Sequence, residues 1–139
     1  MSCYEILGGR PLEGSLTVQG AKNSVLPILA AALLAPGQSV LHNCPQLSDV
    51  SATLDILELL GCRTKREGDT VTVDASALTG SGIPERLMRE MRSSVIFLGA
   101  LLARTGEAEL CYPGGCELGP RPIDLHLAAL RDLGAEIRE

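Results

Sequence analysis

The spacing of apolar residues predicts two pairs of helices in this chain. Within residues 48–60 and again within 122–133, apolar side chains recur every three or four positions, which places them on one face of a helix. The residues that set this spacing are Val50, Leu54, Leu57 and Leu60 in the first segment and Ile123, Leu127, Leu130 and Leu133 in the second. Two further apolar segments, about 24–35 and 92–103, are also expected to be helical.

Short strands are expected between and after these helices. Residues 16–18 and 71–73 alternate apolar and polar side chains, as half-buried strands do. The other expected strands are 38–42 and 107–111, each after the first helix of a pair, and 62–66 and 135–138, each after the second. Helices and strands therefore alternate, which indicates an α/β fold.

The same order of elements occurs twice. Ala32-Leu33-Leu34-Ala35 returns as Ala100-Leu101-Leu102-Ala103, an offset of 68 residues. Leu54-x-x-Leu57-x-x-Leu60-Gly61 returns as Leu127-x-x-Leu130-x-x-Leu133-Gly134, an offset of 73 residues. We infer two copies of one structural unit, at about 21–79 and about 85–139, with a hinge-like connection at 79–84.

The expected helix ends place two cations beside helix N-termini. If Asn23 or Ser24 caps the first helix, Lys22 stands next to its positive end, and if Ser93 or Ser94 caps the equivalent helix, Arg92 does the same. A helix N-terminus with a neighbouring cation suits a phosphate or carboxylate. The alternative is that both cations are ordinary solvated surface residues. Gly61 and Gly134 are expected to end helices in the left-handed conformation, and Pro122 to lie in a first helical turn.

Composition excludes several classes of function. A net charge of -5 and three aromatic residues argue against nucleic-acid binding. The longest apolar run is too short to cross a bilayer, so we expect a cytoplasmic chain with no membrane partner. Five cysteines without a C-x-x-C pair favour neither a disulfide framework nor a metal site. Four of them, Cys3, Cys44, Cys62 and Cys111, are expected to be small buried side chains.

The fifth cysteine lies in the turn-rich stretch PGGCELGPRP, residues 113–122. Gly114 and Gly115 permit backbone angles that a Cβ would forbid, and prolines flank Arg121. A guanidinium near Cys116 would lower the pKa of its thiol toward neutrality, which suits a general acid. The alternative, a structural turn with an incidental cysteine, stays open on spacing alone.

Several motifs in order resemble the UDP-N-acetylglucosamine 1-carboxyvinyltransferases. They are Gly20-Ala21-Lys22-Asn23, Leu26-Pro27-Ile28-Leu29-Ala30, Met91-Arg92-Ser93-Ser94, Pro113-Gly114-Gly115-Cys116, Gly119 and Arg121-Pro122-Ile123-Asp124-Leu125-His126. The resemblance implies repeated βαβ-type units of the enolpyruvyl transferase fold, an inside-out α/β barrel. It also implies transfer of the enolpyruvyl group of phosphoenolpyruvate to the 3′-hydroxyl of UDP-N-acetylglucosamine, without metal or organic cofactor, in peptidoglycan precursor synthesis.

The resemblance also implies roles for individual residues. Lys22, Asn23 and Arg121 would bind phosphoenolpyruvate, and Cys116 would protonate its methylene carbon and be alkylated by fosfomycin. The nucleotide sugar would be bound by Arg92, Arg121, Pro122, Ile123, Asp124 and Leu125. His126 is expected to be packed or hydrogen-bonded rather than catalytic.

The chain departs from the family's pattern in length. It would hold two of the three repeats of one domain, and residues 1–20 would supply strands to another, mostly absent domain. Ser48 stands where the family often has a basic residue. We therefore expect an inactive N-terminal fragment that is poorly stable or self-associates through the surface left uncovered by the missing repeat. Two alternatives are an enzyme similar to the 3-phosphoshikimate 1-carboxyvinyltransferases, disfavoured by the segments around Cys116 and Arg121, and a non-catalytic nucleotide-sugar binding module.

Overall fold

A computed structural model describes residues 3–91, 94–111 and 122–138. The helices are α1 (Lys22–Ala31), α2 (Ser48–Leu59), α3 (Glu85–Glu90), α4 (Phe97–Thr105) and α5 (Asp124–Asp132), with 3-10 turns η1 (Ala32–Leu34) and η2 (Ser94–Ile96). The strands are β1 (Gln38–Leu41), β2 (Arg63–Glu67), β3 (Thr70–Asp74), β4 (Gly82–Ile83) and β5 (Glu109–Leu110). The predicted α/β class is confirmed, and most of the predicted helices and strands lie within a few residues of their expected bounds.

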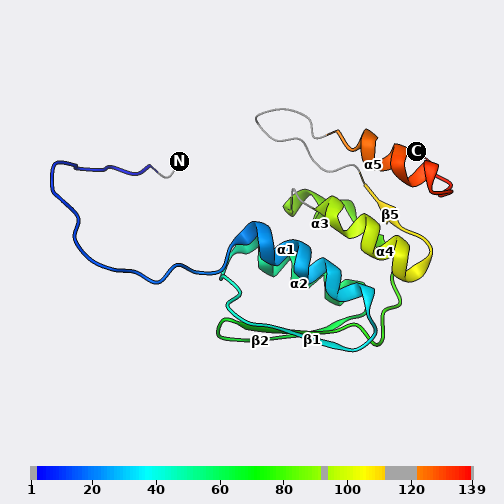
Figure 1. Ribbon diagram of the computed structural model, residues 1–139, viewed down its shortest axis with the longest axis horizontal. Helices are drawn as coiled ribbons and strands as arrows, with labels where there is room; N and C mark the ends of the chain where they lie inside the picture. The colour runs from blue at the N-terminus through cyan, green and yellow to red at the C-terminus, as the bar shows by residue number, and fades with distance from the viewer. Residues whose placement is uncertain (1–2, 92–93, 112–121, 139) are drawn as a thin grey trace.

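Residues 21–79, which we infer to be the first repeat, form a three-stranded antiparallel sheet covered by two helices. The strand order is β1-β3-β2, so β3 is central. β2 and β3 form a hairpin, whose turn contains Gly68 with a φ of 62°. Val71 and Val73 of β3 are fully buried, whereas their neighbours on the strand are half-buried. Figure 1 shows α1 and α2 side by side above this sheet.

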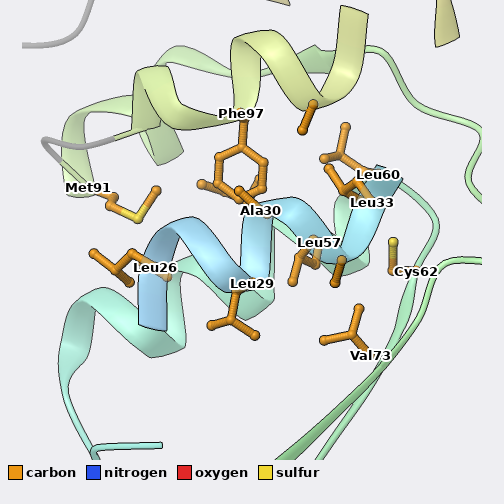
Figure 2. Close-up of a cluster of buried hydrophobic side chains, with 14 of the residues drawn as sticks. Leu26, Leu29, Ala30, Leu33, Leu57, Leu60, Cys62, Val73, Met91 and Phe97 are labelled. Atoms are coloured by element: carbon orange, nitrogen blue, oxygen red, sulfur yellow. The ribbon is translucent and has the colours of Figure 1, made fainter. Parts of the chain in front are cut away.

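One apolar core joins the two repeats. Phe97, the first residue of α4, is fully buried and lies over α1 beside Ala30 (Figure 2). Thr53 of α2 is also fully buried, and its hydroxyl, which has one proton to donate, lies 2.8 Å from the Asp49 carbonyl oxygen and 2.9 Å from the Met91 Sδ. The second repeat is therefore anchored to the first through α4 and the segment that precedes it.

The second repeat is less complete than the first. β4 pairs with β5 in parallel, so the connection at 79–84 contains a strand rather than only a hinge. Residues 135–138 form no strand, which corrects the expectation drawn from the repeat. The reason lies in pairing: β2, their counterpart, pairs with β3, whereas no described strand pairs with 135–138.

The expected strand at 16–18 is also absent. Residues 3–20 contain no helix or strand, and in Figure 1 they extend away from the folded body. Leu16 and Val18 are 84% and 79% exposed, because no strand among the described residues lies beside them. The assignment of this tail to another domain stays a prediction.

The two glycine caps are confirmed. Gly61 and Gly134 have φ values of 99° and 94°, in the left-handed region that ends helices. Pro122 does not lie in the first turn of α5, because the N-cap is Ile123 and the helix begins at Asp124. In the order of layers, α5 lies beyond α4, which in turn lies over α1 and α2 (Figure 1).

Candidate functional site: the N-terminal ends of α1 and α2

The structure brings Lys22 and Asp49 together at the starts of two adjacent helices. Lys22 is the first residue of α1, and Asp49 lies in the first turn of α2. The Lys22 Nζ donates a hydrogen bond to the Asp49 Oδ2 at 3.1 Å. The two side chains are 47% and 26% exposed, so the pair faces solvent and an incoming ligand can reach the amine.

The expected side-chain cap of α1 is wrong. The N-cap is Ala21, whose carbonyl accepts hydrogen bonds from the amides of Ser24 at 3.1 Å and Val25 at 3.0 Å. The helix begins two or three residues earlier than a cap at Asn23 or Ser24, respectively, would allow. As a result, Lys22 belongs to the first helical turn, where its positive charge lies close to the positive end of the helix.

Asp49 belongs to none of the sequence motifs and was not predicted as a site residue. A cation in a first helical turn is electrostatically unfavourable, and the carboxylate of Asp49 compensates both Lys22 and the N-terminus of α2. The sequence did carry a signal for it, since an acidic residue just after Ser48 is typical of a first helical turn. Lys22 therefore has a negatively charged neighbour within the protein, in addition to any anionic ligand that binds at the start of α1.

The loop before α2 is fixed to the rest of the first repeat. Arg66 donates hydrogen bonds to the carbonyls of Cys44 at 3.0 Å and Pro45 at 2.8 Å. Gly20 packs against the same loop so closely that a Cβ there would lie 2.0 Å from the Asn43 carbonyl oxygen. These contacts hold the segment leading to Lys22 against the segment leading to Asp49.

A shallow polar hollow lies at the start of α2, with neither Lys22 nor Asp49 in its wall. It has a volume of about 520 Å³ and lies at the N-terminus of α2, where Ser48, Ser51 and Arg66 contribute to its wall. Ser48 occupies the position where the resemblance leads one to expect a basic residue. This end of the hollow therefore presents hydroxyls together with the guanidinium that holds the loop.

The other candidate residues fall into two groups. Arg92, Cys116 and Arg121 lie outside the described residues. Pro122–Leu125 lead into α5, in a different layer from Lys22 (Figure 1). Asp124 is the first residue of α5, Leu125 is 84% exposed and Ile123 is half-buried. Asn23 and His126 are exposed, so His126 is not packed as expected.

The cysteines divide differently from the expectation. Cys44 and Cys62 are buried, and burial raises the pKa of both thiols. Cys3 and Cys111 are exposed, which corrects the prediction that all four are buried. Cys3 lies in the unpaired tail, and Cys111 follows β5 at the edge of the second repeat, where no described strand covers it.

Residues 3–91, 94–111 and 122–138 contain neither a cluster of metal ligands nor a membrane-spanning helix. Within them no three His, Cys, Asp or Glu side chains are grouped closely enough to hold a metal ion. None of the helices found there has the length and apolar composition of a membrane span.

Comparison with known proteins assigns the chain to a family. The sequence profile of EPSP synthase (3-phosphoshikimate 1-carboxyvinyltransferase) matches residues 6–139. The chain is 52% identical, over its full length, to UDP-N-acetylglucosamine 1-carboxyvinyltransferase 2 of Caldanaerobacter subterraneus subsp. tengcongensis, of which it covers 33%. It is 48% identical over 98% of its length to UDP-N-acetylglucosamine 1-carboxyvinyltransferase 1 of Symbiobacterium thermophilum, of which it covers 32%.

A solved structure supports the same assignment. The enolpyruvyl transferase NikO from Streptomyces tendae matches 71% of this chain with a TM-score of 0.65 and 32% identity, and the match covers 23% of NikO. The chain spans about a third of the length of the curated relatives that it matches. On the profile, the identities and the shared fold, the chain belongs to the EPSP synthase family of carboxyvinyl transferases.

Proposed function

We propose that this chain is part of an enzyme that transfers the enolpyruvyl group of phosphoenolpyruvate to the 3′-hydroxyl of UDP-N-acetylglucosamine and releases phosphate. The observation that carries the proposal is the 52% identity along the whole chain to a relative named for that transfer. The product would be a peptidoglycan precursor, made in the cytoplasm. Both substrates are anions, which suits local cationic sites in a chain whose net charge is -5.

The first repeat would bind the phosphoenolpyruvate. Lys22 is aimed by its 3.1 Å hydrogen bond to Asp49, and it lies in the first turn of α1, at the positive end of the helix. A phosphate approaching the Lys22 amine would therefore meet a positioned cation, with Asn23 as its neighbour toward the sugar. Arg121, by its place in the motif, would add a second cation to the same phosphate.

The second repeat would supply the acid and the nucleotide-sugar contacts. Cys116 would donate its proton to the methylene carbon of phosphoenolpyruvate while the sugar hydroxyl bonds to the adjacent carbon. Loss of phosphate and of a methyl proton would then restore the alkene in the product. Arg92, Arg121 and Pro122–Leu125 would hold the nucleotide sugar, and the base for the sugar hydroxyl would come from outside these 139 residues.

Two measurements test this proposal. Calorimetric titration of the chain with UDP-N-acetylglucosamine and, separately, with shikimate 3-phosphate asks which ligand binds. Binding of shikimate 3-phosphate alone would favour the 3-phosphoshikimate branch and overturn the proposed substrate. A phosphate-release assay with phosphoenolpyruvate and UDP-N-acetylglucosamine asks for turnover, and we expect none from the 139-residue chain by itself. No release even from a full-length protein that binds the sugar would favour a binding module.

A further inference from the structure

Two polar side chains among the described residues are fully buried, Thr53 of α2 and Ser94 of η2. A buried hydroxyl costs free energy unless it makes a hydrogen bond. The Ser94 hydroxyl lies 3.3 Å from the Met88 carbonyl oxygen. The Thr53 hydroxyl lies 2.8 Å from the Asp49 carbonyl oxygen and 2.9 Å from the Met91 Sδ, so it contacts both the first turn of α2 and the end of α3.

Helix formation does not require the Thr53 hydroxyl. In an α-helix the carbonyl of residue 49 already accepts a hydrogen bond from the amide of residue 53. A second donor, from a threonine side chain to the carbonyl four residues earlier, bends a helix slightly. Valine has the same shape and would fill this place without burying a polar atom. The hydroxyl therefore acts on the peptide group of Asp49, the residue whose side chain holds Lys22.

The other contact of the hydroxyl is with a side chain that the core holds in place. Met91 follows the last residue of α3 and is fully buried. It belongs to the same apolar cluster as Leu26 and Leu29 of α1 (Figure 2). A thioether sulfur is a weak acceptor, so its main effect is to limit where the Thr53 hydroxyl, and with it the first turn of α2, can lie.

The Asp49 carboxylate fixes the far end of the Lys22 side chain. Its Oδ2 accepts a hydrogen bond from the Lys22 Nζ at 3.1 Å. A lysine amine on its flexible stem has many rotamers, and a partner within the protein reduces their number. An ammonium group has three protons, so one hydrogen bond to Asp49 leaves the others for a ligand. The amine is thereby held in one direction and can still bind an anion.

We propose that Thr53 and Asp49 are positioning residues for the Lys22 amine. The buried hydroxyl sets the first turn of α2 against Met91, and the carboxylate of that turn sets the amine at the start of α1. Neither residue has to touch a ligand to do this. The consequence for phosphoenolpyruvate binding rests on the proposed function, whereas the positioning of the amine does not.

Positioning and charge predict opposite effects of removing the Asp49 carboxylate. By charge alone, loss of an anion beside Lys22 should strengthen the binding of a phosphate. If the carboxylate positions the amine, its loss should weaken phosphate binding by about two- to tenfold, which is the range for loss of one hydrogen bond. We expect positioning to dominate, because Lys22 and the N-terminus of α2 already neutralise much of the Asp49 charge.

The order of the amine can be measured without any ligand. The chain has two lysines, Lys22 and Lys65, which form ion pairs with Asp49 and Glu67 respectively. Carbon relaxation of the lysine ε-methylene groups in the isotope-labelled 139-residue protein should show Lys22 more ordered than Lys65 on the ps–ns timescale. Thr53→Val should lower the order parameter of Lys22 toward that of Lys65. Thr53→Ser keeps the hydroxyl and should restore it.

Thr105 of α4 offers a matched control. Its hydroxyl lies 2.9 Å from the Leu101 carbonyl oxygen, which is also four residues earlier, and it belongs to a helix that does not carry either lysine. Thr105→Val should leave the order parameters of both lysines unchanged. If Lys22 kept its order in Thr53→Val, or if Lys22 and Lys65 lost order equally, Thr53 would have no positioning role.

Titration with phosphoenolpyruvate, followed on the same two signals, tests the consequence for binding. The Lys22 signal should shift and the Lys65 signal should not. Asp49→Ala should raise Kd about two- to tenfold, and Asp49→Asn, which keeps an oxygen acceptor, should recover part of the loss. Tighter binding by Asp49→Ala would overturn the positioning role of Asp49. No shift of Lys22 in the parent chain would instead count against the phosphate site of the proposed function, and the order parameters would still decide the positioning.

Discussion

The two segments that we infer to be repeats share a helix-strand-helix order, α1-β1-α2 and α4-β5-α5, yet only the first buries both of its helices. In α2 five residues are buried, including Ile56 and Leu57, whereas α5 has none. The difference follows from the sheet: β3 places Val71 and Val73 beneath the helices of the first repeat, and no described strand does this in the second. One central strand therefore decides whether a unit of this kind completes its core.

The repeats also differ in the chemistry assigned to them. The first would supply the phosphate ligand Lys22, and the second would supply the acid Cys116. In the full-length enzyme that the proposed function implies, Cys116→Ser should lower kcat about 10²–10⁴-fold and leave the affinity for UDP-N-acetylglucosamine nearly unchanged, because a hydroxyl is too weak an acid. Lys22→Ala should instead weaken phosphoenolpyruvate binding. Steady-state kinetics with calorimetry separates the two, and identical profiles would refute this division.

Because Phe97 is buried and Leu133 is exposed, we expect alanine substitutions at these two positions to change the free energy of unfolding by very different amounts. Phe97→Ala, at the contact between the repeats, should lower the free energy of unfolding by about 3–5 kcal/mol through a lost side chain and a cavity. Leu133→Ala just after α5, where the leucine is 84% exposed, should change it by less than about 0.5 kcal/mol. Urea unfolding of both variants measures this contrast, and a cost above 2 kcal/mol at Leu133 would mean that another element covers that leucine.

The same contrast explains which elements could be predicted from sequence. α2 and α5 were both found from apolar spacing, because a helix satisfies its own backbone hydrogen bonds. The strands expected at 16–18 and 135–138 are absent because a strand also needs a partner. Val71 and Val73, with the same alternation as Leu16 and Val18, form a strand between two neighbours.

The candidate site was only partly predictable for a related reason. Lys22 stands out by its place at a helix start, but its partner Asp49 is 27 residues away in sequence. The sequence favours Asn23 or Ser24 as the cap because their side chains can accept a hydrogen bond from a helix amide. The observed cap, Ala21, has no such side chain and uses its backbone carbonyl. Arg66, which holds the loop before α2 through two carbonyls, likewise shows no motif.

A pair of glycine substitutions tests how closely the first repeat is packed. Gly20→Ala places a Cβ 2.0 Å from the Asn43 carbonyl oxygen and should cost about 1–3 kcal/mol as the backbone shifts. Gly99→Ala in α4 of the second repeat meets no atom within 4 Å and should add about 0.5–1 kcal/mol of stability. Thermal unfolding of the two variants should show shifts of opposite sign. If Gly20→Ala left the melting temperature unchanged, the loop at Asn43 would be able to move aside for the added Cβ at little cost.

The ion pair of the candidate site should contribute little to stability. Asp49→Asn should lower the free energy of unfolding by about 1 kcal/mol or less, because the pair is partly exposed, and the loss should shrink as salt rises. Glu67→Gln breaks the Lys65–Glu67 pair, 3.0 Å apart but two-thirds exposed on both sides, and should cost less still. Urea unfolding at low and high salt checks both. A larger cost for Glu67→Gln would argue against a special role for Asp49.

The smallest expected effect is a pH dependence that belongs to the first repeat. Hydrogen bonds from the Ser76 hydroxyl and amide lower the pKa of Asp74 at the end of β3, with Arg63 adding a minor contribution, and the Ser76 amide lies 3.0 Å from the Asp74 Oδ1. Since the folded pKa lies below the unfolded value of about 3.9, the stabilisation is present above that value and is lost as the pH falls through the folded pKa. Urea midpoints measured from pH 5 downward should fall less steeply for Asp74→Asn, with Ser76→Ala between it and the parent chain because the amide remains. If the urea midpoints of both variants fell with pH as steeply as those of the parent chain, the acid sensitivity would not come from Asp74 at the end of β3.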